Sequence, residues 1–131
     1  MEGKTMEAVQ THKAPSAIGP YSQAICAGGF VFVSGQIPID PRTGEMVNGG
    51  FSDQARQSLE NMKQILIASG SGIEKVVAVD AFLTNIAEFS VFNEVYGTYF
   101  SDNKPARVVV EVKGLPKGAM VEVKCIALAP A

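Results

Sequence analysis

The stretch that decides the first part of the fold is Ser-Gln-Ala-Ile-Cys-Ala-Gly-Gly-Phe-Val-Phe-Val-Ser (residues 22–34). This segment contains two short apolar runs, residues 22–27 and 30–34, separated by the pair Gly28-Gly29. Paired glycines between two such runs predict a tight β-hairpin, because glycine adopts the backbone angles that a two-residue turn requires. The Phe-Val-Phe-Val run is β-branched and aromatic without polar alternation, so we expect a strand that is buried on both faces.

A helix is predicted from residue 52 onward. Ser52 carries a hydroxyl group that suits the N-cap, and Gly70 and Gly72 suit the end of the helix because glycine adopts left-handed backbone. Between the hairpin and this helix, residues 37–50 are rich in proline, glycine and aspartate, which predicts a long ordered loop. The apolar residues that recur at helical spacing are Ala55, Leu59, Met62 and Leu66.

A second helix and further strands follow. Asn85, with Glu88 three residues later, matches the pattern of a capping box at a helix start. The stripe of the helix that follows is aromatic and consists of Phe89, Phe92, Tyr96 and Tyr99. The apolar, β-branched runs that predict strands are residues 75–83, 107–112 and 121–128, with an additional edge strand near residues 8–11.

The resulting order, β-β-α-β-α-β-β, predicts a single α+β domain over residues 1–131, with residues 1–7 as a loose leader. We expect two helices to cover one face of a mixed sheet and to leave the other face open. Only 18% of the residues are charged and 47% are hydrophobic, whereas a typical soluble domain has about 25% charged residues. Because this charge is scarce for the surface of a small domain, we expect the chain to assemble with itself over the open face.

The overall charge and the cysteines exclude several classes of protein. The net charge is −2 and the sequence has no basic stripe, so a nucleic-acid partner is not expected. The apolar runs are too short for a membrane span, and the first residues lack the apolar core of a secretion signal. Cys26 and Cys125 lie in apolar runs and are expected to be buried, reduced thiols. These features predict a cytoplasmic protein.

Two charged residues within apolar strands are candidates for chemistry. Arg107 begins a strand, and its guanidinium group can bind a carboxylate through two parallel hydrogen bonds, or can simply face water. Glu122 interrupts an apolar run, where burial would raise its pKa and suit the carboxyl group to proton transfer. The alternative role of Glu122 is a salt bridge to Lys124 or to a neighbouring subunit.

Four further residues are candidates for lining a binding site. Tyr21 follows Gly19-Pro20, a turn that can hold its hydroxyl group at a pocket rim, although packing alone would also explain this residue. Ser34-Gly35 ends the Phe-Val-Phe-Val strand, where glycine permits a ligand to approach the backbone or merely lets the strand end. Asn93 lies beside the aromatic stripe and can also be a surface or capping amide.

Several kinds of catalytic site are excluded by composition. His12 is the only histidine, so neither a histidine-based triad nor a histidine-rich metal site can form. The two cysteines lack metal-ligand spacing, and Gly70-Ser71-Gly72 follows a helix rather than a strand, unlike a dinucleotide-binding loop. We therefore expect no metal and no cofactor, and a reaction carried out by Arg, Glu, Tyr, Ser and backbone groups on a small polar substrate.

Six segments of the chain are distinctive: Ile-Gly-Pro-Tyr-Ser-Gln-Ala (18–24), Ser-Gly-Gln-Ile-Pro-Ile-Asp-Pro-Arg-Thr-Gly-Glu (34–45), Gln-Ser-Leu-Glu-Asn-Met-Lys (57–63), Asn-Glu-Val-Tyr (93–96), Pro-Ala-Arg (105–107) and Leu-Pro-Lys-Gly-Ala-Met-Val-Glu-Val (115–123). In this order and spacing they resemble the reactive-intermediate deaminase family over about residues 8–129. The family is also called RidA/YjgF, and older names for it are endoribonuclease L-PSP and translation inhibitor.

The resemblance implies a chorismate-mutase-like α+β fold and a homotrimer with clefts between subunits. It also implies hydrolysis of 2-imino acids, or of their enamine tautomers, to 2-keto acids and ammonia, as by a 2-iminobutanoate/2-iminopropanoate deaminase. Pyridoxal-phosphate dehydratases release such imines. Carried onto this chain, the resemblance makes Arg107 the holder of the substrate carboxylate and Glu122 the residue that positions or activates water. The remaining residues of the implied cleft are Tyr21, Ser34 and Asn93, with Gly35 supplying backbone contact.

The chain departs from the family pattern beside both charged residues. Val108 and Val109 follow Arg107, where family members often have Ser or Thr and then Cys, so a more apolar cleft wall and an altered substrate range are expected. Lys124 stands where the family often has an acid.

Two alternative functions remain open at this stage. The first is an RNA-cleaving or translation-inhibiting protein, against which the acidic composition argues. The second is a non-catalytic 2-keto-acid sensor or holdase, in which Arg107 would bind the ligand and Glu122 would not be required for affinity.

Overall fold

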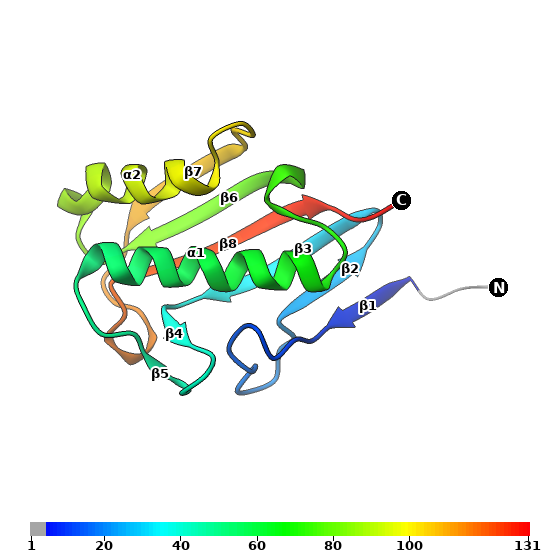
Figure 1. Ribbon diagram of the computed structural model, residues 1–131, viewed down its shortest axis with the longest axis horizontal. Helices are drawn as coiled ribbons and strands as arrows, with labels where there is room; N and C mark the ends of the chain where they lie inside the picture. Colours follow the sequence, from blue (N-terminus) through cyan, green and yellow to red (C-terminus); the bar gives the residue numbers. More distant parts are fainter. Residues whose placement is uncertain (1–4) are drawn as a thin grey trace.

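The computed structural model describes residues 5–131 and places two helices over one face of a six-stranded sheet (Figure 1). The helices are α1 (Phe51–Ala68) and α2 (Phe89–Tyr99). The strands of the sheet, in spatial order, are β1 (Met6–Val9), β2 (Ala24–Ala27), β3 (Phe30–Gln36), β8 (Val121–Leu128), β6 (Val76–Leu83) and β7 (Ala106–Glu111). A separate hairpin consists of β4 (Ile39–Asp40) and β5 (Glu45–Met46), and 3₁₀ turns occur at Ile73–Lys75, Ile86–Glu88 and Pro116–Gly118.

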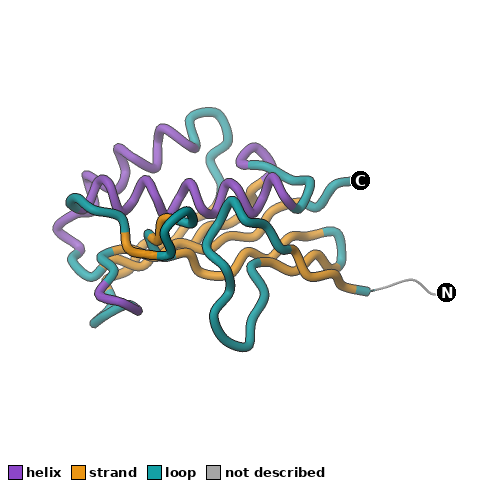
Figure 2. Tube along the Cα trace, turned by 60° about the horizontal axis from the view of Figure 1, so that its bottom comes forward, coloured by secondary structure: helices purple, strands orange, loops and turns teal. Residues whose placement is uncertain are grey.

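The sheet is mixed, as the sequence predicts. Its neighbouring strands are antiparallel except for β6 and β7, which are parallel and connected through α2. Both helices lie on the same side of the sheet, and neither reaches its other face (Figure 2). The predicted α+β class, order of elements and two-helix cover are therefore confirmed. We call the side of the sheet away from α1 and α2 the open face.

The hairpin of β2 and β3 forms at Gly28-Gly29, where both glycines have positive φ (59° and 87°). The prediction that β3 is buried on both faces is wrong for the single chain. Val31 and Val33 point into the core beneath the helices, whereas Phe30 and Phe32 on the open face are 38% and 44% exposed. The valines are buried and the phenylalanines exposed because both helices lie on the same side of the sheet, so no element of the chain covers the other side.

The cap of α1 differs from the prediction. The N-cap residue is Gly50 rather than Ser52, which lies inside the first turn. The Gly50 N–H donates to the Asp53 carboxylate at 3.2 Å, so a side chain within the helix satisfies the free backbone group. At the other end Gly70 has the expected positive φ (85°), whereas Gly72 is extended, so its predicted left-handed role is wrong.

Three further segments refine the predicted elements. Residues Met6 and Glu7 belong to β1 rather than to a loose leader, since they pair with Ala27 and Cys26; residues 1–4 of that predicted leader lie outside the described residues. The predicted loop at 37–50 contains the short strands β4 and β5. The predicted capping box does not form at α2 itself. The Asn85 side chain accepts from the Ala87 N–H at 3.0 Å and caps the 3₁₀ turn that precedes α2.

Both cysteines are free thiols, as predicted. Cys125 is buried on the core side of β8, and burial raises the pKa of its thiol to about 12, so it is scarcely ionised at neutral pH. Cys26 is only half-buried, so its predicted full burial is not found. Within residues 5–131, neither helix is both long enough and apolar enough to cross a membrane.

Candidate functional site

A cavity of about 750 Å³ opens on the open face, where the end of β3 meets β8. Four of the six residues that the sequence singles out line it: Tyr21, Ser34, Gly35 and Glu122. They come from three parts of the chain, namely the segment before β2, the end of β3 and the start of β8. The structure therefore brings these four predicted site residues together in one cavity.

Strand alternation places Glu122 in this cavity. Val121 and Val123 point toward the helices and are fully buried, so Glu122 between them must point to the open face. Its side chain is half-buried. Burial raises the pKa of the Glu122 carboxyl group above its ordinary value, and the nearby positive charge of Lys124 lowers it in part. No ion pair between the two side chains is found within the described residues, so a salt bridge to Lys124 does not account for Glu122, and the alternative of a salt bridge to a neighbouring subunit stays a prediction.

Gly35 provides the space that Glu122 occupies. The pairing of β3 with β8 shifts between Val33 and Gln36, which places an irregularity in β3 at Ser34 and Gly35. A Cβ atom on Gly35 would lie only 2.9 Å from Cδ of Glu122 and closer still to its Oε2. The Glu122 carboxylate therefore lies against this glycine, and the predicted approach of a ligand to the Gly35 backbone stays a prediction.

Ser34 and Tyr21 form part of the cavity wall. The Ser34 hydroxyl group donates to the Ser22 carbonyl oxygen at 2.6 Å, so its proton is engaged and its oxygen remains able to accept a hydrogen bond. Tyr21 is 51% exposed, as expected for a rim position. The turn before it is held by the Tyr21 N–H, which donates to the Gly19 carbonyl at 2.9 Å.

Arg107 and Asn93 form a second cluster on the opposite face of the sheet. Arg107 pairs with the buried Val79 in the parallel β6–β7 ladder, so its side chain lies on the helix side. One of its guanidinium nitrogens, Nη1, donates to Oδ1 of Asn93 at 2.9 Å. The Cζ atom of the guanidinium lies 4.7 Å from the centre of the Tyr96 ring, within the range of a cation–π contact.

The structure thus does not bring Arg107 and Asn93 into the cavity of Glu122. Arg107 also does not simply face water, because the rings of Phe89 and Phe92 lie 5.7 and 6.0 Å from its Cζ atom. Burial raises the pKa of the neighbouring Tyr96 to about 12, although the charge of Arg107 opposes this shift. An uncharged tyrosine leaves Arg107 without a competing anion in this cluster and available to an external carboxylate.

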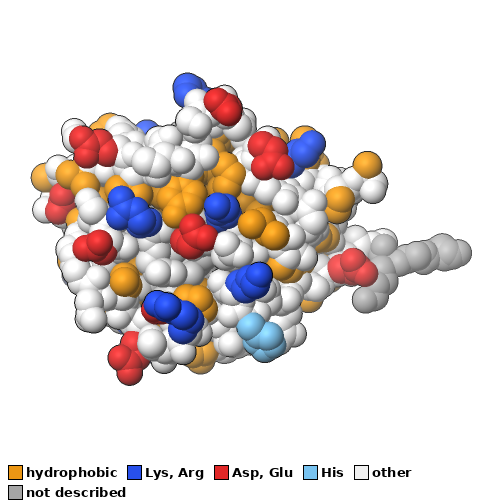
Figure 3. All heavy atoms as spheres, in the orientation of Figure 1, with side chains coloured by type: hydrophobic (Ala, Val, Ile, Leu, Met, Phe, Trp, Pro, Cys, Tyr) orange, Lys and Arg blue, Asp and Glu red, His pale blue; other side chains and the backbone are white. Residues whose placement is uncertain are grey.

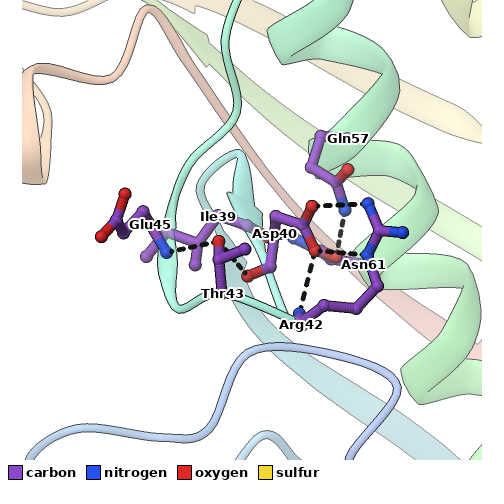
Figure 4. A network of polar contacts seen from close by, with 7 residues as sticks. All are labelled: Ile39, Asp40, Arg42, Thr43, Glu45, Gln57 and Asn61. Carbon is purple, nitrogen blue, oxygen red and sulfur yellow. Dashed lines mark hydrogen bonds and ion pairs between the residues drawn. The ribbon is translucent and has the colours of Figure 1, made fainter.

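A buried amide that the sequence analysis missed fixes another wall of the cavity (Figure 4). Asn61, in α1, is fully buried, and its Nδ2 donates to the carbonyl oxygens of Ile37 (3.2 Å) and Ile39 (2.9 Å). The Oδ1 of Asn61 accepts from the Gln57 side chain at 2.8 Å. Ile37 and Ile39 both line the cavity. Asn61 lies outside the predicted apolar stripe of this helix, so helical spacing gave no signal for its burial.

The hairpin beyond this wall has its own polar network (Figure 4). Arg42 donates to both carboxylate oxygens of Asp40, from Nε at 3.1 Å and from Nη2 at 2.8 Å. These hydrogen bonds lower the pKa of Asp40 below its ordinary value. The Glu45 N–H donates to the Thr43 hydroxyl oxygen at 3.2 Å. Neither Asp40 nor Arg42 borders the cavity, so we assign this network to the hairpin.

The helix-bearing face carries charges of both signs (Figure 3). On the helix-bearing face, acidic and basic side chains are interspersed and no continuous basic stripe is visible (Figure 3). Among residues 5–131, no group of three or more His, Cys, Asp and Glu side chains is placed to hold a metal ion. The arrangement on the open face is instead suited to moving a proton, because a carboxyl group with a raised pKa borders a solvent-accessible cavity.

Known proteins are similar to this chain in sequence and fold along nearly its whole length. A model of the family described as Endoribonuclease L-PSP matches residues 11–129. A RutC family protein of Pyrococcus horikoshii is 53% identical over 121 residues, covering 92% of this chain and 96% of that protein. The human 2-iminobutanoate/2-iminopropanoate deaminase is 43% identical over 120 residues, covering 92% of this chain and 88% of that protein. The crystal structure of E. coli TdcF with bound serine has a TM-score of 0.90 at 40% identity, covering 95% of this chain and 99% of that one.

Proposed function

Because the chain belongs to the endoribonuclease L-PSP family, also called the RidA/YjgF family, we propose that it hydrolyses 2-imino acids to 2-keto acids and ammonia. The human relative with 43% identity bears the name of such a deaminase. The observation that carries the proposal is the half-buried Glu122 carboxylate, which borders the cavity and has a raised pKa. A carboxyl group of this kind is suited to accept a proton and then return it.

In the proposed reaction Glu122 acts as base and then as acid. Its carboxylate accepts a proton from a water molecule while the water oxygen forms a bond to C2 of the iminium ion. The carboxyl group then returns this proton to the nitrogen of the carbinolamine, and the C–N bond breaks. Ammonia departs with the remaining hydroxyl proton as ammonium, which leaves the 2-keto acid. The iminium carbon is already electrophilic, so positioning and proton transfer are the contributions that the protein has to make.

The substrate carboxylate requires a cationic partner, and we assign this role to Arg107 of a neighbouring subunit in a homotrimer. Within one chain Arg107 lies on the helix side of the edge strand β7, whereas Glu122 lies on the open face. The open face exposes large apolar side chains on separate strands, including Phe32, Val108 and Leu128. Burying this face between subunits would remove the apolar surface from water and could bring one chain's Arg107 to another chain's cavity.

The test is imine hydrolysis by purified variants under single-turnover conditions, with 2-iminobutanoate generated by a dehydratase. We expect Arg107→Ala to lower catalytic efficiency about a hundredfold, since the carboxylate would lose a charge-assisted bidentate partner. Arg107→Lys should restore little, because an ammonium group cannot reproduce the planar fork. Arg56→Ala, which removes an exposed arginine of α1, is the matched control.

Glu122→Gln and Tyr21→Phe complete the series. The first keeps the shape of the side chain but removes the proton acceptor, so turnover should fall more than binding. The second removes one hydrogen-bonding hydroxyl, worth about 1 kcal/mol, and should be milder. Near wild-type rates in both Arg107→Ala and Glu122→Gln would refute the proposed roles. Ligand binding without hydrolysis would favour the sensor, and ribonuclease activity lost in Arg107→Ala would favour the RNA-cleaving alternative.

A further inference from the structure

Two lysines, Lys117 and Lys124, line the same cavity as Glu122. The proposed hydrolysis uses neither of them, since a simple imino acid has one carboxylate and Arg107 is its proposed partner. Glu122 is the one acidic residue among the described residues that border this cavity. The cavity therefore offers more positive charge than a substrate with a single carboxylate requires.

Lys124 makes only a weak ion pair within the chain. It lies opposite Asp80 in the β6–β8 ladder, and its Nζ is 4.0 Å from Oδ2 of Asp80. The side chains are 49% and 42% exposed, and an exposed ion pair at this distance is weak. Lys124 can therefore exchange Asp80 for an anion in the cavity. Because it follows Glu122 by two residues on the same face of β8, the two positions are about 6.6 Å apart along the strand.

Lys117 reaches the cavity from a strained turn. It has φ 58°, the single positive φ of a non-glycine residue among the described residues. Side chains disfavour this left-handed region, and such strain concentrates at ligand-binding sites. Within residues 5–131, Lys117 has no ion pair and no hydrogen bond through its side chain. Its ammonium group is exposed and available to a ligand.

The cavity of the single chain is of the order that accommodates drug-sized molecules, but a neighbouring subunit on the open face would occupy part of it, so the two lysines rather than the volume indicate the substrate. We propose that the preferred substrate is a 2-imino acid whose side chain ends in a second carboxylate, bound by Lys124 with Lys117. A five-carbon diacid is long enough to place C2 at Glu122 and its terminal carboxylate at Lys124. This inference rests on the proposed function and names the substrate class of the same site.

The experiment compares two imines of equal length, 2-iminoglutarate and 2-iminopentanoate, generated in situ by oxidases from glutamate and norvaline. They differ only in ending in a carboxylate or a methyl group. We expect wild-type kcat/KM to be at least about tenfold higher for the diacid, the effect of one charge-assisted contact. Lys124→Met should reduce this ratio to within about threefold of unity and Lys117→Met should reduce it by less. Lys75→Met, at an exposed lysine outside the cavity, should keep the wild-type ratio.

A second measurement separates this inference from the proposed function. Calorimetry with 2-oxoglutarate and 2-oxopentanoate compares the same two ligand classes without hydrolysis, and a preference for the diacid that disappears in Lys124→Met supports the inference. Hydrolysis of both imines with a wild-type ratio at or below one overturns the inference and leaves the proposed function intact. A ratio that Lys124→Met does not change overturns it as well. Hydrolysis of 2-iminobutanoate with neither five-carbon imine accepted also overturns the inference and leaves the proposed function intact, whereas hydrolysis of none of the three imines refutes the proposed function and the inference with it.

Discussion

The Glu122 side chain occupies the space in which a side chain at position 35 would lie. A methyl group on Gly35 would meet Cδ of Glu122 at 2.9 Å, so the carboxylate would have to move. We expect Gly35→Ala to lower kcat/KM about a hundredfold, because a displacement near 1 Å is enough to misplace a catalytic group. Gly114→Ala is the control, since its added methyl group would have no neighbour within 4 Å. Equal kinetics for the two variants would contradict the assigned position of Glu122.

The charge of Lys124 should be visible in the pH dependence of the reaction. Burial raises the pKa of Glu122 and Lys124 lowers it, so removing the positive charge leaves the burial effect unopposed. The base must be ionised, and activity is therefore lost as pH falls through this pKa. We expect Lys124→Met to move the acid limb of the kcat/KM profile for 2-iminobutanoate to higher pH. An acid limb that stays in place, or moves to lower pH, would show that Glu122 is not the group that titrates.

At the scale of elements, Asn61 joins α1 to the cavity wall. Replacing it with leucine leaves the carbonyl oxygens of Ile37 and Ile39 without their donor inside the protein. We expect Asn61→Leu to lower the free energy of unfolding by about 2–4 kcal/mol. Gln64→Ala removes a more exposed hydrogen bond of the same helix, to Glu60, and should cost about 0.5 kcal/mol or less.

Urea denaturation of both variants at one protein concentration measures this difference, since the stability of an oligomer depends on concentration. If Asn61→Leu unfolded at the same urea concentration as Gln64→Ala, the carbonyl contacts would not stabilise the fold as described.

Elements were predictable where one strong local pattern governs them. The glycine pair of the β2–β3 hairpin and the helical spacing of α1 were sufficient for that reason. The N-cap of α1 was not predictable. Ser52 is a good N-cap residue by type, but the contact of Asp53 with Gly50 depends on the path of the preceding loop. Tertiary context overrides such weak local preferences.

The candidate site was predictable in its residue types but not in its geometry. The sequence identified Arg107 and Glu122 as charges in apolar strands. It could not show that they lie on opposite faces, because that depends on the parallel register of β6 with β7. It also did not reveal the αL backbone of Lys117, which no local motif indicated.

At the scale of the whole molecule, the central claim is that one complete site requires two subunits. The separation of Arg107 from Glu122 within a chain and the apolar open face both support this claim. It predicts that the protein is a trimer at micromolar concentration, which sedimentation equilibrium can measure. A stable monomer would leave Arg107 outside the cavity and would remove the basis of the shared site.

The most direct test is to mix two inactive variants, Arg107→Ala and Glu122→Gln, after dissociation and reassembly. If each site takes Glu122 from one subunit and Arg107 from the next, equal mixing into trimers restores about a quarter of the wild-type sites. Each variant reassembled alone serves as the control and should remain inactive. We expect activity to recover to near this fraction in the mixture. No recovery, in trimers shown by mass to contain both variants, would contradict a site shared between subunits.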